Sequence, residues 1–150
     1  MKNFKNIEVF EQAYRRTATI VFAEIISVVV LLMLAWGIPL EERKAADAIL
    51  NTLWGLVLMI AVTTIFLRRF LFSKRRIQEI KKNSVEAVVG ALGTATIILA
   101  ALAGSVAVLG FVITILSGDK MSILRSTAVS FLLFLIVFPR KSRWKGFIEV

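Results

Sequence analysis

Glu24 is the residue whose type and position first point to chemistry. It lies in TATIVFAEIISVVVLLML (17–34) and is the only acid of the chain deep inside an apolar segment. Acids in a membrane segment are costly to bury and almost always face a bundle interior or an aqueous cavity. A carboxyl group at this position could couple a proton or hold a cationic substrate. Ser27, three residues on, adds a hydroxyl group to the same helical face.

Two other roles remain open for Glu24. In a structural role, it would bond to Ser or Thr side chains of the third apolar segment, or to Arg68 or Arg69 reaching up from the membrane boundary. In an interface role, it would meet a partner subunit. Glu24 follows Arg16 by eight residues, which is about 12 Å along a helix at 1.5 Å per residue. The carboxyl group is therefore expected in the cytoplasmic half of the hydrocarbon layer.

Two aromatic and basic clusters, FLRRFLF (66–72) and FPRKSRW (138–144), supply a second set of candidate residues. Arg binds phosphate oxygens in bidentate fashion, and Lys adds a point charge. The candidate contacts for anionic lipid headgroups of the cytoplasmic leaflet are therefore Arg68, Arg69, Arg140 and Lys141. The aromatic side chains of both clusters, Trp144 included, also suit anchoring at the membrane interface.

The composition excludes several classes of chemistry. The chain has neither Cys nor His, which rules out disulfides, thiolate nucleophiles, imidazole bases and Cys/His zinc sites. Acids are scarce, so a carboxylate-built metal cage is also hard to assemble. Glu24 and a few hydroxyl groups are too little for acid–base or nucleophilic catalysis. We therefore expect no enzyme, no metal and no cofactor.

The elements that must position these residues are membrane helices. Hydrophobic residues make up 58% of the 150-residue chain, against about 45–50% in soluble domains, and they are gathered into blocks. We predict an all-α membrane protein with one domain, a bundle of four transmembrane helices. The expected spans are about 17–38, 48–67, 87–116 and 121–138, with a basic cytoplasmic loop at 68–86.

The distribution of Lys and Arg predicts the orientation. Of the 19 basic residues, only Arg43, Lys44, Lys120 and Arg125 fall in or near the two hairpin connections. The others lie in the two terminal segments and in the loop at 68–86. Cytoplasmic loops carry the excess of Lys and Arg, so both termini should be cytoplasmic and the protein integral to the cytoplasmic (inner) membrane. This placement explains the net charge of +9 without a nucleic-acid partner.

The tetrapeptide TATI occurs at 17–20 and again at 94–97, which raises the hypothesis of an internal duplication. Each copy lies in an apolar segment that is followed by a short connection and a second apolar segment. Two hairpins of the same orientation would form a parallel repeat about an axis along the membrane normal. In this alignment Glu24 corresponds to Ala101, so the acid has no counterpart in the second copy.

The third apolar segment is rich in small residues at helical spacing, which allow two helices to approach closely. The predicted packing face consists of Ala87, Ala91, Ala95, Ala100 and Gly104. This face could pack within the bundle or form an interface between chains. We therefore expect a homo-oligomer or a subunit of a membrane complex, with membrane lipids as further partners.

Two resemblances carry functional implications. The chain resembles the GtrA-like four-helix family of polyprenyl-phosphate-sugar flippases in its layout and in the two clusters at 66–72 and 138–144, although Leu67 and Pro139 replace the Asn of the family motif. That resemblance implies lipid-linked sugar translocation, with Arg68, Arg69, Arg140 and Lys141 near the phosphate. The segment FAEII (22–26) also looks like the first helix of small multidrug-resistance transporters, where the acid couples protons to cation export.

Together these features predict a small polytopic membrane protein of one of two kinds. The first is a transporter or flippase for a lipid-linked or hydrophobic ionic substrate. The alternative is a non-catalytic membrane subunit, anchor or immunity-type protein that binds other transmembrane helices through its small-residue face.

Overall fold

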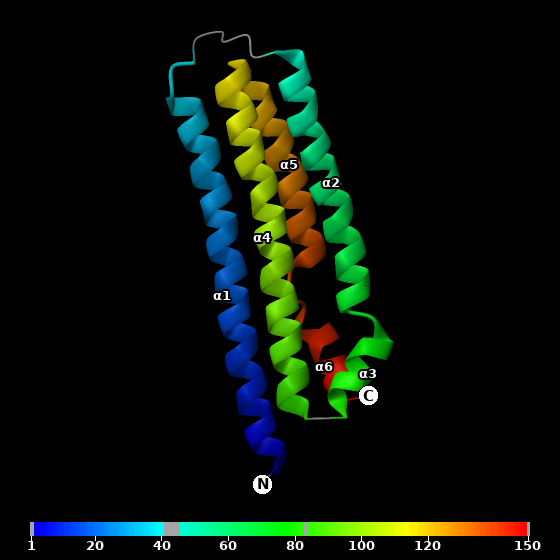
Figure 1. The fold of residues 1–150 in the computed structure, drawn as a ribbon. Helices are drawn as coiled ribbons and strands as arrows, with labels where there is room; N and C mark the ends of the chain where they lie inside the picture. Colours follow the sequence, from blue (N-terminus) through cyan, green and yellow to red (C-terminus); the bar gives the residue numbers. More distant parts are fainter. Residues whose placement is uncertain (1, 41–45, 83, 150) are drawn as a thin grey trace.

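The computed structural model describes residues 2–40, 46–82 and 84–149, and within them the chain is entirely α-helical apart from short connections (Figure 1). The helices are α1 (Lys2–Gly37), α2 (Asp47–Leu71), α3 (Lys74–Lys81), α4 (Val85–Ser117), α5 (Lys120–Val137) and α6 (Lys141–Glu149). Among these described elements, α1, α2, α4 and α5 are long and apolar enough to cross a membrane. The predicted fold class is confirmed.

Helix α4 is the centre of the bundle. It contacts α1, α2, α3, α5 and α6, and it carries the longest run of buried residues. Helices α1 and α2 lie on either side of the α4–α5 pair, and α1 runs parallel to α4 (Figure 1). The α1–α2 and α4–α5 hairpins thus have the same direction, as a parallel repeat requires. Both termini lie at one end of the bundle, which we call the terminal end.

Local signals in the sequence set the ends of α4 and α5. The Ser84 side chain accepts a hydrogen bond from the Ala87 backbone N–H and caps the start of α4. Gly118 ends the same helix in the left-handed conformation, with φ of 72°, which favours glycine. The Asp119 carboxylate then accepts from the Met121 N–H at 2.9 Å and begins α5. This tight connection makes α4 and α5 antiparallel neighbours.

The α4–α5 contact depends on very close approach of the two backbones. A Cβ atom on Gly110 would lie 1.6 Å from Ser126 Oγ and 2.3 Å from Ser126 Cβ, so only glycine fits. Farther along the contact, Ser130 Oγ donates a 2.6 Å hydrogen bond across the interface to the Ala103 carbonyl. Small residues therefore allow dispersion contacts and one interhelical hydrogen bond to hold the hairpin in a membrane.

Helix α1 also approaches α4 closely, although less closely than α5 does, along a line of small residues. A Cβ atom on Gly93 would lie 3.1 Å from Thr17 Oγ1. At the opposite end of α1, the Lys120 ammonium group donates to the Trp36 carbonyl at 3.0 Å and so joins the start of α5 to the end of α1. The two contacts hold α1 against the α4–α5 hairpin at the middle of α1 and at its Gly37 end.

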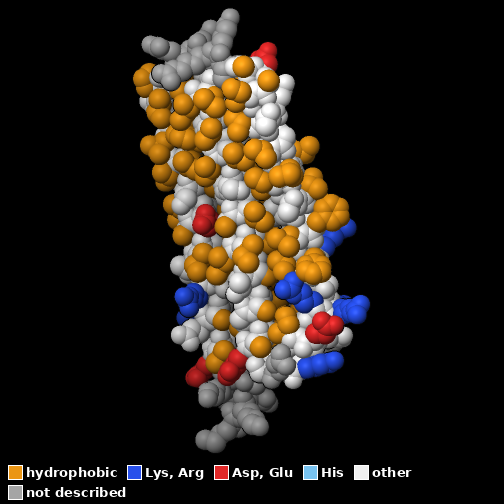
Figure 2. Space-filling model, viewed as in Figure 1, with side chains coloured by type: hydrophobic (Ala, Val, Ile, Leu, Met, Phe, Trp, Pro, Cys, Tyr) orange, Lys and Arg blue, Asp and Glu red, His pale blue; other side chains and the backbone are white. Residues whose placement is uncertain are grey.

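The outer surface is apolar over most of its length, which suits contact with lipid. Large side chains such as Phe22, Met33, Leu58 and Leu135 are more than half exposed. Figure 2 shows hydrophobic side chains over the upper and middle parts of one face, and Lys and Arg gathered in its lower half, towards the terminal end. An exposed apolar surface of this extent marks a surface that another apolar phase covers.

The helices extend beyond the predicted spans towards the terminal end. Helix α1 begins at Lys2, and α2 continues through Arg68 and Arg69 to Leu71. The basic loop at 68–86 contains α3, and the segment after Pro139 forms α6, which the sequence reasoning did not predict. Arg43 and Lys44 of the first hairpin connection lie outside the described residues.

Candidate functional site

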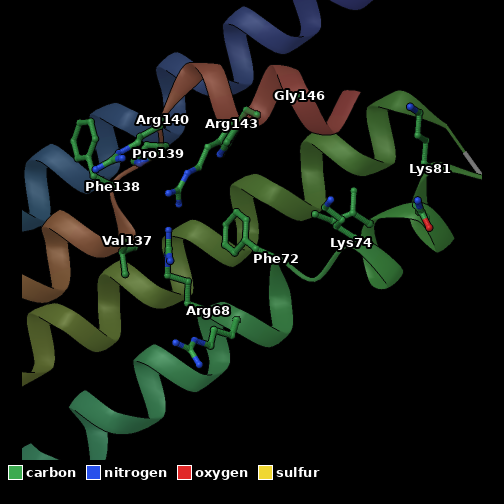
Figure 3. Close-up of a pocket in the computed structure, with 14 residues that line it drawn as sticks. Arg68, Phe72, Lys74, Lys81, Val137, Phe138, Pro139, Arg140, Arg143 and Gly146 are labelled. Atoms are coloured by element: carbon green, nitrogen blue, oxygen red, sulfur yellow. The ribbon is translucent and has the colours of Figure 1, made fainter. Parts of the chain in front are cut away.

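A cavity of about 640 Å³ lies at the terminal end of the bundle, between α2, α3, the end of α5 and α6 (Figure 3). We call it the basic pocket. Its lining residues are Arg68, Arg69, Phe72, Lys74, Ile77, Gln78, Lys81, Val137, Phe138, Pro139, Arg140, Arg143, Trp144 and Gly146. Small-molecule sites commonly have volumes of about 300–1,000 Å³, so the pocket is large enough for a ligand.

One wall of the pocket comes from the turn between α2 and α3. Helix α2 ends at Leu71, and Ser73 takes an extended conformation before α3 begins at Lys74. Ile77 holds α3 in place because it is buried against Val88, Val89 and Leu92 of α4. The apolar face of this short basic helix therefore packs on α4, within the segment predicted from the sequence as a basic loop.

The opposite wall comes from the turn between α5 and α6. Pro139 restricts the preceding residue, Phe138, to an extended conformation, observed at φ −49° and ψ 129°, so α5 ends at Val137. The chain leaves the helical conformation over the next residues, and α6 begins at Lys141. This break brings Arg140 and Arg143 to the cavity from the side opposite Arg68 (Figure 3).

Helix α6 is fastened to the terminal part of α1 by an aromatic cluster and two polar contacts. The Trp144 ring meets the rings of Tyr14 and Phe10 edge-on, with centroids 5.7 and 6.4 Å apart. The Tyr14 hydroxyl group donates to the Pro139 carbonyl at 3.1 Å. Only 1% of Trp144 is exposed, so its predicted place in an interfacial belt is wrong: this side chain is part of the core.

The pocket is strongly electropositive. Arg68, Arg69, Lys74, Lys81, Arg140 and Arg143 line it, and none of the lining residues that the structure describes is acidic. Arg68 is half-buried, and the charges of Arg143 and Arg140 act on it across the cavity. Like charges at close range raise the free energy of the empty site and focus a positive potential on it. An anionic ligand would remove that repulsion.

The structure brings together three of the four residues predicted to contact headgroups: Arg68, Arg69 and Arg140. Lys141 lies outside the lining because its ammonium group pairs with the Glu11 carboxylate at 2.5 Å. Sequence reasoning missed the contributions of Lys74, Lys81 and Arg143 to the pocket. Arg143 is part of the second aromatic and basic cluster, and that cluster was the signal that could have identified it.

Glu24 lies apart from the pocket, on the face of α1 that meets α4. Its Oε2 atom is 3.1 Å from the position that a Cβ atom on Gly104 would occupy, so the glycine makes room for the carboxyl group. Arg68 and Arg69 are on α2, and no ion pair in the described part of the chain joins either of them to Glu24. Ser27 donates to the Ala23 carbonyl of its own helix and does not join Glu24.

The predicted packing face divides into a buried and a half-buried part. Ala95, Ala100 and Gly104 are buried within the bundle, whereas Ala87 and Ala91 are half-buried. Gly93 and Gly110 make the close approaches to α1 and α5. At least the central part of this small-residue face therefore packs within a single chain.

Four long apolar helices with a basic pocket at one end define a small multi-pass membrane protein. Comparison with protein-family models, with curated proteins and with solved structures finds no match for the chain. The resemblance to the GtrA-like family therefore rests on sequence layout and on the two terminal-end clusters alone.

Proposed function

We propose that the chain is a small transporter of the flippase type, which takes the anionic group of a lipid-linked or hydrophobic ionic substrate into the basic pocket. One observation carries the proposal: the clusters at 66–72 and 138–144, far apart in the sequence, line the same cavity from opposite sides. In the GtrA-like family the corresponding motifs end the two hairpins. Their convergence on one electropositive cavity is what a shared phosphate site would require.

The position of the pocket suits an amphiphilic ligand. Its cations lie beside the apolar side chains of Phe72, Val137 and Phe138, at the level where α2 and α5 end. A ligand with a charged head and an apolar chain could place the head among the cations and keep the chain in lipid. Helices α1 and α2 expose apolar faces on which a second copy could complete a pathway, so the proposal includes a homo-oligomer.

The terminal end is proposed to face the cytoplasm, because the excess of Lys and Arg lies there. The chain has no native Cys, so single Cys substitutions report orientation directly. In spheroplasts of a bacterial host, Lys82→Cys on the terminal end should react with a membrane-impermeant maleimide only after lysis. Asp119→Cys at the opposite end should react in intact spheroplasts. The reverse labelling pattern would overturn both the orientation and a cytoplasmic pocket.

The flippase proposal is tested in vesicles with fluorescent anionic lipids. Purified protein in phosphatidylcholine vesicles should move NBD-labelled polyprenyl phosphate, phosphatidic acid or phosphatidylglycerol between leaflets, as measured by dithionite quenching. Arg68→Gln should slow this movement about ten-fold or more, because it removes a charge-assisted hydrogen bond worth at least about 1.4 kcal/mol. Arg75→Gln is the matched control, since Arg75 lies on α3 but outside the pocket lining.

If folded protein moves none of the three lipids, the flippase proposal is refuted. If it moves them, Glu24→Gln separates a coupling role from a structural one. A variant that stays folded but loses dependence on a proton gradient would support coupling. Unchanged translocation with unchanged gradient dependence would end the coupling role of Glu24, and the neutral amide would then be a sufficient replacement beside Gly104.

A second candidate function is favoured by Glu24, which is only half-buried and makes no ion pair in the described residues. A non-catalytic membrane subunit, anchor or immunity-type protein could use this acid and the exposed faces of α1 and α2 to bind another membrane protein. Purification of the tagged chain from native membranes distinguishes the two candidates. Constant recovery in a larger complex of fixed stoichiometry would favour the subunit.

A further inference from the structure

The basic pocket contains more positive charge than a singly charged ligand can balance. Four of its cations are arginines, Arg68, Arg69, Arg140 and Arg143, contributed from α2 and from the segment that includes α6. None of the four is in an ion pair within the described part of the chain, because the ion pairs found there use Arg75 and Lys141. Their charges are therefore available to a ligand.

The geometry of guanidinium groups further restricts the class of ligand that the pocket fits. Each arginine offers a planar set of donors that matches two oxygens of a phosphate group. A phosphodiester has two unesterified oxygens and one negative charge. A phosphomonoester has three such oxygens and a charge of about −1.5 to −2 at pH 7, and a diphosphate ester has more of both. Arginines on opposite walls of one cavity can share the oxygens of these more highly charged groups.

We propose that the basic pocket is a site for a phosphate group that can carry two negative charges, a phosphomonoester or a diphosphate, and that it discriminates against phosphodiesters. This inference rests on the proposed function only for the source of the ligand, a lipid. It narrows the ligand to a lipid phosphomonoester or a lipid diphosphate, because a polyprenyl-phosphate sugar is a phosphodiester with one negative charge. Phe72 and Phe138 provide the apolar surface beside the cations, against which the carbon part of the ligand packs.

Binding to purified full-length protein in detergent tests the proposal. The probes are dioctanoyl phosphatidic acid, a phosphomonoester, and dioctanoyl phosphatidylglycerol, a phosphodiester with the same acyl chains. Titration calorimetry should give a Kd for the first that is about ten-fold lower or more, equivalent to about 1.4 kcal/mol. Competition by inorganic pyrophosphate then shows whether the phosphate group belongs to a lipid or to a soluble compound. Competition at a similar Kd indicates a soluble phosphate compound, and much weaker competition indicates a lipid; both support the phosphate class.

Variants keep the test specific to the pocket. Arg143→Lys retains the charge and removes the planar set of donors, so it should weaken phosphatidic acid binding and reduce the preference over phosphatidylglycerol. Arg68→Gln should do both more strongly, while Arg75→Gln should change neither. Gel filtration and the thermal midpoint establish that each variant is folded. Equal Kd values for the two lipids, or a preference that survives Arg143→Lys and Arg68→Gln, would overturn the proposal.

The binding test and the flippase test can fail independently of each other. If folded protein binds phosphatidic acid selectively but moves no lipid in vesicles, the phosphate site stands and the flippase proposal fails. If lipids move in vesicles but the two probes bind equally, the flippase stands and the selectivity for doubly charged phosphate fails.

Discussion

Gly110→Ala is expected to destabilise the protein, although alanine is the better helix former. A methyl group at this position would meet the Cβ and Oγ atoms of Ser126, at 2.3 and 1.6 Å, and rotation of the side chain cannot move the Cβ atom away. The α4 and α5 backbones must therefore separate. Overpacking of this kind costs about 1–3 kcal/mol and sometimes more. We expect a lower thermal midpoint in detergent and less monodisperse protein on gel filtration.

Gly90→Ala is the matched control for this prediction. Gly90 lies on the same helix, and a Cβ atom there has no neighbour within 4 Å. Its replacement should be neutral, or stabilising by up to about 1 kcal/mol through helix propensity. Adding Ser126→Gly to Gly110→Ala should restore part of the lost stability, because the second change removes the clashing atoms. Equal stability of Gly110→Ala and Gly90→Ala would show that α4 and α5 are not packed this closely.

The contrast between Gly110 and Gly90 illustrates what the sequence could not provide. Both glycines belong to the same run of small residues, and spacing alone does not say which of them meets another backbone. Only the arrangement of α4 and α5 distinguishes them. The four membrane-spanning helices and the end of the fourth before Pro139 were predictable, in contrast, because each depends on residues that are adjacent in the sequence.

The basic pocket likewise combines features that follow from neighbouring residues with features that depend on how the helices pack. The two clusters that line it were identified as phosphate-binding candidates from the chemistry of Arg68, Arg69 and Arg140. That they form one site depends on how the hairpins pack, which no local pattern encodes. Lys141 was expected at the site because it is a cation of the second cluster, but its side chain reaches Glu11 instead.

Trp144→Ala is expected to release α6 from the bundle. Truncation of a buried large aromatic side chain costs about 3–5 kcal/mol, and Trp144 is the main apolar contact between α6 and the Phe10–Tyr14 face of α1. Among the described residues, the polar contacts that remain with α1 are the Tyr14–Pro139 hydrogen bond and the part-exposed Lys141–Glu11 ion pair, worth about 1 kcal/mol each or less. They are too weak to hold α6 against α1 once the ring is lost.

Release of α6 should be local, since the α4–α5 hairpin and its contacts with α1 and α2 do not depend on it. Hydrogen exchange at the backbone amides of 141–146 should therefore become much faster in Trp144→Ala, while amides at the middle of α4 stay protected. Because Arg143 leaves the pocket together with α6, phosphatidic acid binding should fall at least as far as in an Arg143→Gln variant.

Two control variants distinguish loss of α6 docking from loss of a direct contact between the Trp144 ring and the ligand. Trp144→Phe keeps an aromatic ring in the cluster and should retain most of the amide protection and most of the binding. Trp36→Ala removes an exposed tryptophan at the opposite end of the bundle and should change neither. If Trp144→Ala loses binding while the 141–146 amides remain protected, the ring itself contacts the ligand and α6 is held by other means. If Trp144→Ala keeps both amide protection and phosphatidic acid binding, the aromatic cluster between α1 and α6 is not what positions Arg143 in the pocket.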